Sequence, residues 1–472
     1  MNIKNTLLML MSAFMVFACT SDFEEINSDP NRIQESRPEN LMAPALYELN
    51  RLQMRSAHRL SHEFMQYSVQ TNEINEFHRF VIPTTESNYL WENYYTTLTD
   101  VQDILLLGEK NEAPNYIAVA KVLRAWIFSN LTDMFGPIPF TEALKGYSDK
   151  IYQPAFDSQE TIYKALLADL EEANTLFDEG KPINAESDLL FSGSVNKWRK
   201  FANSLRLRLL MRVEKKAVMN VQAQIKVMFD NPDKYPVFSS NEEAAVMYYS
   251  ENLPFVNPLS KYREFEFNGN RGLAEAFINT LKTFNDPRLE LIATKTSEEE
   301  YTGVVSARGK GEGIPESYST YRPELQATTQ SGIIFPYAEV EFLWAEAALK
   351  GWINSDAAAH YQKGIEASMA YWGAEMPGDY MNRPGVTFDN QLGTLIRQKW
   401  IALFFCGFES WYDYRRTGYP VLAIGGGAEN DGIVPTRMPY PSTLQSLNAT
   451  NYQKAVEMLG ADDLQVKCWW MK

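Results

Sequence analysis

Aromatic side chains stand beside hydrogen-bonding residues at several places in the sequence. One group lies in the segment 89–95, and the others lie in stretches rich in Gly, Pro and Ser. A sugar ring has an apolar C–H face and a rim of hydroxyls, so flat rings with polar neighbours can bind it. Segments of that composition usually run over the surface. The candidate ligand-contact residues are Tyr89, Trp91, Tyr262, Phe265, Tyr318 and Tyr321.

The interpretation of Trp91 has a structural alternative. Trp91 and the nearby Tyr94 lie in a segment with helical periodicity, so both could equally be core anchors of that helix. Tyr262, Tyr318 and Tyr321 lie outside such periodicity. We therefore expect a contact role more strongly for these three tyrosines.

Paired carboxylates are a second source of chemistry. Hydrolysis of a glycosidic bond needs two carboxyl groups about 5–10 Å apart, and sequence spacing does not give that distance. Glu339, Glu341 and Glu346 share one predicted helix, and Glu171 and Glu172 share another. Most such groups are exposed charges or helix caps. Because the chain also lacks a Gly-x-Ser-x-Gly elbow and a Cys-x-x-Cys pair, the residue chemistry favours a protein that is not an enzyme.

Two further patterns resemble cofactor sites without matching them. His58 and His62 share a helical face at a spacing that can hold zinc, but residue 59 is Arg where a zinc peptidase needs Glu. We therefore interpret them as two ordinary imidazoles. The segment 303–311 is one residue too long for a phosphate loop, and Gly311 stands where Ser or Thr is required. The sequence predicts no cofactor, with a structural calcium ion left open.

Composition bounds the class of protein. Of 472 residues 45% are hydrophobic and 22% are charged, which excludes general disorder. A net charge of −16 argues against a nucleic-acid partner. Cys406 and Cys468 are interpreted as buried apolar groups. A basic stripe is most simply the solvated side of an amphipathic helix. Its members are Arg206, Arg208, Arg212, Lys215 and Lys216.

The beginning of the chain carries a targeting signal. A positive start precedes the apolar run Leu7–Ala18, which is too short to cross a bilayer and is typical of a secretory signal. The run ends Val-Phe-Ala-Cys, a pattern similar to a bacterial lipobox. This predicts a signal peptide over 1–18, lipidation of Cys19 and a polar tether over 19–40. Plain secretion with cleavage nearby is the alternative.

Helical periodicity dominates the remainder, residues 41–472. Successive helices joined by short turns predict antiparallel pairs stacked like tetratricopeptide repeats, although no 34-residue period is present. We therefore predict a mainly α fold: one α-superhelical domain with few short strands and loop-rich insertions near 248–336 and 420–442. The expected helices cover 89–107, 114–135, 158–177, 194–213, 337–351, 356–371 and 394–405.

Ordered motifs along nearly the whole chain resemble the SusD/RagB family of nutrient-binding outer-membrane lipoproteins, in its SusD-like starch-binding-associated branch. Most specific is the stretch Ala-Glu-Val-Glu-Phe-Leu-Trp-Ala-Glu-Ala-Ala. The segments that carry the resemblance are 23–31, 120–125, 133–139, 285–289, 338–348, 398–403, 407–411, 414–420, 437–441 and 467–470.

The resemblance implies a lipid-anchored protein of the outer membrane, facing the cell exterior. It implies four tetratricopeptide-like helix pairs under a loop-rich ligand face, a glycan or oligosaccharide ligand, and a SusC-type TonB-dependent transporter as partner. It supplies no catalytic mechanism. The motif residues Arg124, Arg288, Glu339 and Arg415 are interpreted as buried or semi-buried pairing groups rather than ligand contacts. Peptide cargo, a surface glycosidase and a helical-repeat adaptor are the alternatives.

Overall fold

A computed structural model describes residues 37–72 and 76–472. The signal peptide, Cys19 and nearly all of the predicted tether lie outside the described residues. Pro38 already belongs to the first described helix, so the last three residues of the stretch interpreted as tether are helical. Among the described residues, no helix is both long and apolar enough to cross a membrane.

The predicted helices form, and local sequence sets their ends. Helix α6 begins at Pro114 and ends before Gly136, whose φ of +89° favours glycine. The side chains of Ser158 and Ser194 accept hydrogen bonds from the backbone N–H groups of Thr161 and Lys197 and so cap α7 and α8. The described helices are α3 (Pro38–Ser56), α4 (His62–Phe64), α5 (Thr84–Lys110), α6 (Pro114–Phe135), α7 (Gln159–Leu176), α8 (Val195–Arg212), α9 (Val221–Asp230), α10 (Glu275–Phe284), α11 (Arg288–Ile292), α12 (Tyr337–Leu349), α13 (Ala357–Trp372), α14 (Leu392–Ala402), α15 (Glu409–Thr417), α16 (Leu444–Leu447) and α17 (Ala449–Leu459).

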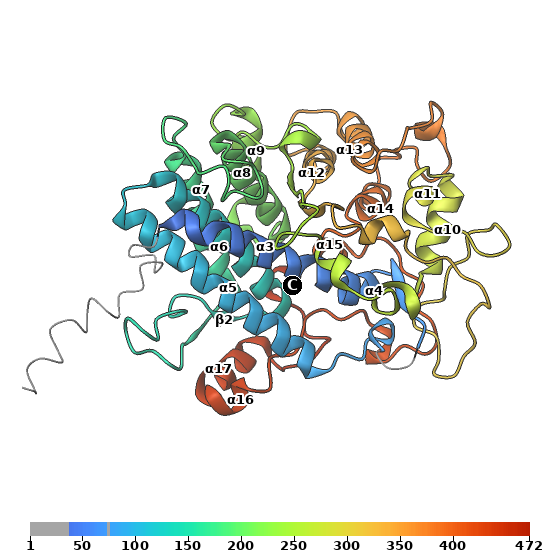
Figure 1. Cartoon of the computed structure of the whole chain (residues 1–472), viewed down its shortest axis with the longest axis horizontal. Helices are drawn as coiled ribbons and strands as arrows, with labels where there is room; N and C mark the ends of the chain where they lie inside the picture. Colours follow the sequence, from blue (N-terminus) through green and yellow to red (C-terminus); the bar gives the residue numbers. More distant parts are fainter. Residues whose placement is uncertain (1–36, 73–75) are drawn as a thin grey trace, which may run out of the picture. The chain divides into compact units, whose positions relative to one another are not determined.

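Helices that follow one another in sequence pack side by side. Contacts join α5 to α6, α6 to α7 and α7 to α8 in one group, and α12 to α13 and α14 in another (Figure 1). Helix α3 lies along α5. The prediction of a mainly α fold built from helix pairs is confirmed. Sequence patterning missed α3, and it missed α10 and α11 within the region 248–336.

In the described part of the chain, strands are short and form three antiparallel pairs. Strand β1 pairs with β5, β2 with β3, and β4 with β6. The β1–β5 pair joins residues about 200 positions apart, with Gln70 opposite Arg271. The strands are β1 (Ser68–Gln70), β2 (Ile138–Pro139), β3 (Phe156–Asp157), β4 (Ala245–Met247), β5 (Arg271–Leu273) and β6 (Gly332–Phe335).

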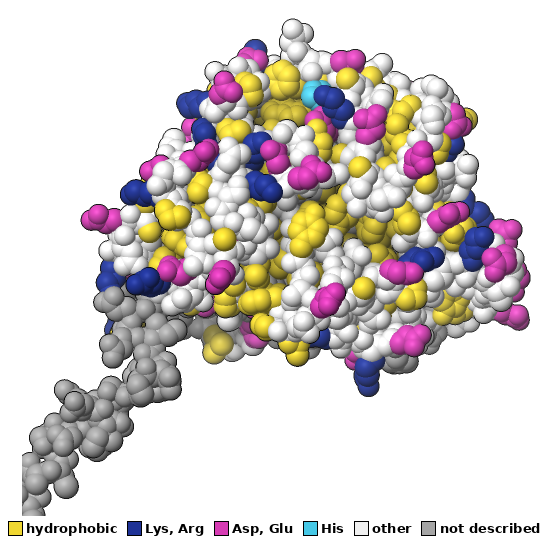
Figure 2. All heavy atoms as spheres, turned by 45° about the horizontal axis from the view of Figure 1, so that its top comes forward, with side chains coloured by type: hydrophobic (Ala, Val, Ile, Leu, Met, Phe, Trp, Pro, Cys, Tyr) yellow, Lys and Arg dark blue, Asp and Glu magenta, His cyan; other side chains and the backbone are white. Residues whose placement is uncertain are grey.

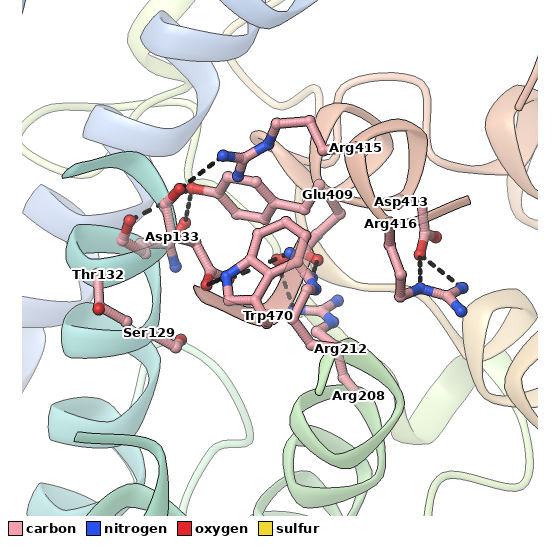
Figure 3. A network of polar contacts seen from close by, with 12 residues as sticks. Ser129, Thr132, Asp133, Arg208, Arg212, Glu409, Asp413, Arg415, Arg416 and Trp470 are labelled. Carbon is pink, nitrogen blue, oxygen red and sulfur yellow. Dashed lines mark hydrogen bonds and ion pairs between the residues drawn. The ribbon is translucent and has the colours of Figure 1, made fainter. Parts of the chain in front are cut away.

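Buried charges cross-link the helices. The solvated stripe expected on α8 is wrong: Arg208 and Arg212 are each 3% exposed, and Arg206 is also buried. Arg208 binds Glu339 of α12, with Nε 2.9 Å from Oε1. We call Asp133, Arg208, Arg212, Glu339 and Glu409 the scaffold ion network; Figure 3 shows most of its members. Each cation here has a carboxylate partner, which is the condition for burying it.

The other residues interpreted as buried agree with the structure. Arg288 is fully buried and bonds Asp286. Arg415 is buried with Nη1 bonded to two backbone carbonyls, and its guanidinium lies 3.9 Å from the ring centroid of Trp411. Cys406 and Cys468 are free and buried, as predicted. On the face in Figure 2, acidic and basic side chains are mixed and neither sign forms a continuous patch.

Candidate functional site

A cavity of about 330 Å³ opens beside the β1–β5 pair. Its size is at the lower end of the roughly 300–1,000 Å³ typical of small-ligand sites. The end of α3, strand β1, the following turn and the segment 262–271 build its walls. The lining residues are Arg55, His58, Arg59, Gln70, Asn72, Phe77, Tyr262, Glu266, Asn270 and Arg271.

Two π-helical segments flank this cavity. The first, η1 (Ala57–Ser61), continues α3 and supplies His58 and Arg59. The second, η6 (Phe265–Gly269), supplies Glu266. Such single π-turns are rare and often occur at functional sites. Their coincidence at one cavity favours a binding role for this region.

The β1–β5 pair forms one wall. Gln70 and Arg271 are directly opposite each other, so their side chains project from the same face of the ribbon. The Arg271 guanidinium is 2.8 Å from Glu63 and donates to Ser68 Oγ at 3.0 Å. Burial raises the pKa of the Glu63 carboxyl, although Arg271 opposes the shift. Arg271 is therefore held in place by its own partners.

His58, which lines the cavity, has a buried nitrogen without a hydrogen-bond partner among the described residues. Its ring stacks on Phe267 at 5.3 Å between centroids, and Nε2 lies 3.2 Å from the Phe267 carbonyl. A carbonyl only accepts, so Nε2 carries the proton and Nδ1 keeps its lone pair. Nδ1 is buried and has no hydrogen-bond partner. Burial, with Arg271 nearby, lowers the pKa of His58 well below its usual range, so the ring is neutral.

Two more polar atoms of the lining lack a hydrogen-bond partner. The Tyr262 hydroxyl is one, and Nε of Arg55 is the other. The Arg55 guanidinium lies over the ring of Tyr89, 4.7 Å from its centroid. A buried polar atom without a partner costs free energy, so such groups are normally satisfied by protein, water or ligand. Three of them around one cavity point to a polar, hydroxyl-bearing ligand.

The described lining of the cavity contains few acidic side chains. Among the described lining residues, Glu266 is the one carboxylate, whereas a glycosidase needs two. The acids considered from sequence are engaged elsewhere: Glu339 with Arg208, Glu346 with Arg416, and Glu341 with His360. Among the described residues, no three His, Cys, Asp or Glu side chains form a group that could hold a metal ion.

The six aromatic residues predicted to contact ligand lie in different places in the structure. Tyr262 lines the cavity. Tyr89 lies one layer behind, where its hydroxyl accepts from Arg51 and its ring supports Arg55. Phe265 begins η6, and its side chain is outside what the structure describes. Trp91 is half-buried among Tyr95, Phe135, Phe156 and Tyr440, away from the lining, as expected for a helix anchor.

The surface position expected for Tyr321 is wrong. Its side chain is fully buried, and the hydroxyl lies 2.7 Å from His62 Nδ1. Tyr318 packs beside Gly272, where a Cβ would lie 2.8 Å from the tyrosine ring. Because side chains alternate along a strand, this is the face of the ribbon opposite to Arg271. Tyr318 and Tyr321 thus support the cavity wall from behind.

Sequence reasoning missed most of the lining. It noted His58 only as half of a metal-like pair, and it gave no role to Arg55, Arg59 or Arg271. One available signal was the i, i+4 spacing of Arg51, Arg55 and Arg59, which places three cations on one face of a helix. Arg271 had no such signal, because β-pairing over a long sequence separation positions it.

The sequence of residues 30–441 matches the family described as SusD-like, starch-binding associating with outer membrane. The chain belongs to the SusD-like family. The resemblance inferred from the motifs is thereby confirmed, and with it a family associated with carbohydrate binding at the outer membrane. No curated protein sequence matches the chain.

Solved structures share the SusD-like fold over nearly their full length. A chitin-binding protein is 29% identical, with a TM-score of 0.78 over 92% of this chain and 99% of that one. A chitin-binding SusD homologue from Flavobacterium johnsoniae is 22% identical, with a TM-score of 0.79 over 92% and 98%. A SusD homologue from Bacteroides fragilis is 22% identical, with a TM-score of 0.80 over 93% and 100%.

Proposed function

We propose that this SusD-like protein is a non-catalytic glycan-binding lipoprotein and that the cavity beside the β1–β5 pair is its ligand site. The observation that carries the proposal is that three residues of the cavity lining each have a buried polar atom without a hydrogen-bond partner among the described residues: Arg55 Nε, His58 Nδ1 and the Tyr262 hydroxyl. A sugar offers hydroxyls that both donate and accept, together with an apolar face for the Tyr262 ring. The solved relatives that bind chitin support carbohydrate as the ligand class.

The proposal extends to the cellular setting. Lipidation of Cys19 would hold the protein at the outer membrane, where it delivers ligand to a SusC-type TonB-dependent transporter. Replacing Cys19 with alanine is then expected to release the protein from the membrane fraction. A gene for a large TonB-dependent barrel beside this one, and a membrane complex on co-expression, are the expected signs of the partnership.

Binding is tested by calorimetry on protein lacking residues 1–18. Tyr262→Ala is expected to cost about 1–3 kcal/mol of binding free energy, as for a central aromatic contact. Tyr248→Ala is the matched control, since Tyr248 is 69% exposed and lies outside the cavity lining.

The ligand panel contains starch-type, chitin-type and acidic oligosaccharides together with oligopeptides. Binding of peptides alone would replace glycan by peptide cargo. Release of shortened sugars after long incubation would contradict the non-catalytic role. Equal affinity in Tyr262→Ala and the parent protein would move the site elsewhere.

A further inference from the structure

We infer that the cavity selects glycans carrying a carboxylate, such as those built with uronic acids, over neutral glycans of the same size. This inference rests on the proposed function of the cavity as a glycan site. It assigns to Arg55 the role of contacting the ligand carboxylate.

The charges around the cavity do not balance. Arg59 is 2.5 Å from Glu86, and Arg271 is 2.8 Å from Glu63. The lining acid Glu266 is bound by Arg263, 2.9 Å away. Each of these pairs is neutral in sum. Among the described residues, no carboxylate forms an ion pair with Arg55. Glu266 is near enough to feel its charge but is already bound by Arg263, so the cavity wall keeps one positive charge in excess.

Arg55 is also held in a fixed orientation. Its guanidinium lies over the Tyr89 ring, and Tyr89 is itself fixed by the hydrogen bond from Arg51. Nε is buried without an acceptor. A guanidinium is planar and binds a carboxylate through two parallel N–H groups, and little side-chain entropy is lost when it is already ordered. Arg55 therefore lacks both a hydrogen-bond acceptor for Nε and an ion-paired carboxylate, and a ligand carboxylate would supply both.

The remaining free positions suit a sugar that bears this carboxylate. His58 Nδ1 can only accept, so it needs a donor such as a hydroxyl. The Tyr262 hydroxyl can donate or accept. A uronate presents hydroxyls next to its carboxylate on one small ring. Arg55, His58 and Tyr262 all line the same cavity of about 330 Å³.

The preference is local and opposes the overall charge of the chain. With a net charge of −16, the protein as a whole repels anions at long range. Salt screens charges separated by more than about 8 Å at physiological ionic strength, so the contact at Arg55 outweighs the distant acids. We therefore expect the preference for the charged ligand to persist in physiological salt.

The experiment compares ligands that differ only in the carboxylate. Tetrasaccharides of galacturonate, alginate and hyaluronan are each measured beside their carboxyl-reduced, neutral counterparts, with starch and chitin oligosaccharides as further neutral references. We expect at least one acidic ligand to bind about tenfold or more tightly than its reduced form, because a charged hydrogen bond contributes about 1.5–3 kcal/mol.

Three variants assign the preference to Arg55. Arg55→Gln is expected to reduce the acidic-to-neutral ratio to about threefold or less. Arg55→Lys restores part of the ratio because it keeps the charge. Arg322→Gln is the matched control. It removes the same charge from an arginine that lies outside the cavity lining and is paired with Glu324.

The outcomes separate this inference from the proposed function. If only neutral glycans bind, or if acidic and reduced forms bind equally, the preference is overturned while the glycan site stands. If Arg322→Gln lowers the ratio as much as Arg55→Gln, the contact assigned to Arg55 is overturned. If no glycan binds and an acidic peptide binds through Arg55, both the glycan function and the uronate preference are overturned.

Discussion

Buried polar groups are treated in opposite ways in two regions of this molecule. In the scaffold ion network, Arg212 forms ion pairs with both Asp133 and Glu409 (Figure 3). Arg208 forms an ion pair with Glu339. Around the cavity, Arg55 Nε, His58 Nδ1 and the Tyr262 hydroxyl have no partner. Paired groups hold helices in register, whereas a buried group without a partner costs folding free energy that a ligand can recover. Atoms without a hydrogen-bond partner also occur in the scaffold, as at Arg208 Nη1, so the cavity is distinguished by having three of them among the residues of one lining.

The largest change in stability is expected from a substitution in the scaffold ion network. Glu339→Ala removes the carboxylate that Arg208 and Lys399 share, and leaves those cations buried. Removing one partner of a buried pair costs about 3–5 kcal/mol. The free energy of unfolding from guanidinium denaturation should fall by that amount.

The control for Glu339→Ala is the acid at the cavity rim. Glu266 is paired with an exposed arginine, and exposed pairs contribute little. Glu266→Ala should therefore leave the denaturation midpoint unchanged. Similar losses in the two variants would remove the contrast between the regions.

Acid should lower the free energy of unfolding first through the buried histidines on the cavity side of the molecule. Burial lowers the pKa of His58 and His62 well below the usual range and that of His78 to about 3. The unfolded chain binds protons at about pH 6.5 while the folded chain does not, so stability falls as pH drops below 6.5 toward 3. Each of these imidazoles should lower the free energy of unfolding by about 1 kcal/mol for every unit that the pH falls in this range. Protonation of Glu63, whose pKa is raised, partly offsets this loss.

Asp413, a neighbour of the scaffold ion network, keeps its negative charge over the same pH range. Lys399 and Arg416 hold the pKa of Asp413 well below its usual value against the opposing effect of burial. Unfolding free energies at pH 7.5 and 5.5 measure the loss. His78→Asn keeps an acceptor for the Ala307 N–H but does not titrate. The unfolding free energy of this variant should therefore fall less steeply with decreasing pH. An unchanged slope would show that His78 is protonated in the folded protein.

Two tyrosine hydroxyls give a smaller and more selective contrast. Tyr321→Phe removes the hydroxyl that His62 contacts and should cost about 1 kcal/mol of stability. Tyr262→Phe removes a hydroxyl without a partner and should leave stability unchanged or slightly higher. The same Tyr262 variant should weaken glycan binding by about 1 kcal/mol. Thermal unfolding measures the stability of both variants, and calorimetry measures their glycan binding. A loss of stability in Tyr262→Phe would contradict the expected difference between the two hydroxyls.

The finest test is spectroscopic. His58 is protonated on Nε2, because that atom faces a carbonyl. His62 is protonated on Nδ1, because its Nε2 accepts from the Phe405 N–H. The chain has four histidines, so ¹⁵N-histidine labelling should resolve two neighbours on one helix in opposite neutral tautomers. The same tautomer at both would mean that His58 Nδ1 is not a free acceptor.

Local signals in the sequence determined the helices and their ends. Periodicity, Pro114, the caps Ser158 and Ser194 and the stop at Gly136 act within a few residues, so they can be read without the fold. Motif order was enough to indicate the SusD-like family, and the apolar run before Cys19 predicted the anchor.

Only the tertiary structure decided which side chains share a cavity. Arg55, Tyr262 and Arg271 come together through a strand pair about 200 residues apart in sequence. The same long-range packing buried Tyr321 and placed the arginines of α8 inside the scaffold. The physical reason is that burial and pairing depend on partners distant in the chain, which neither composition nor local spacing encodes.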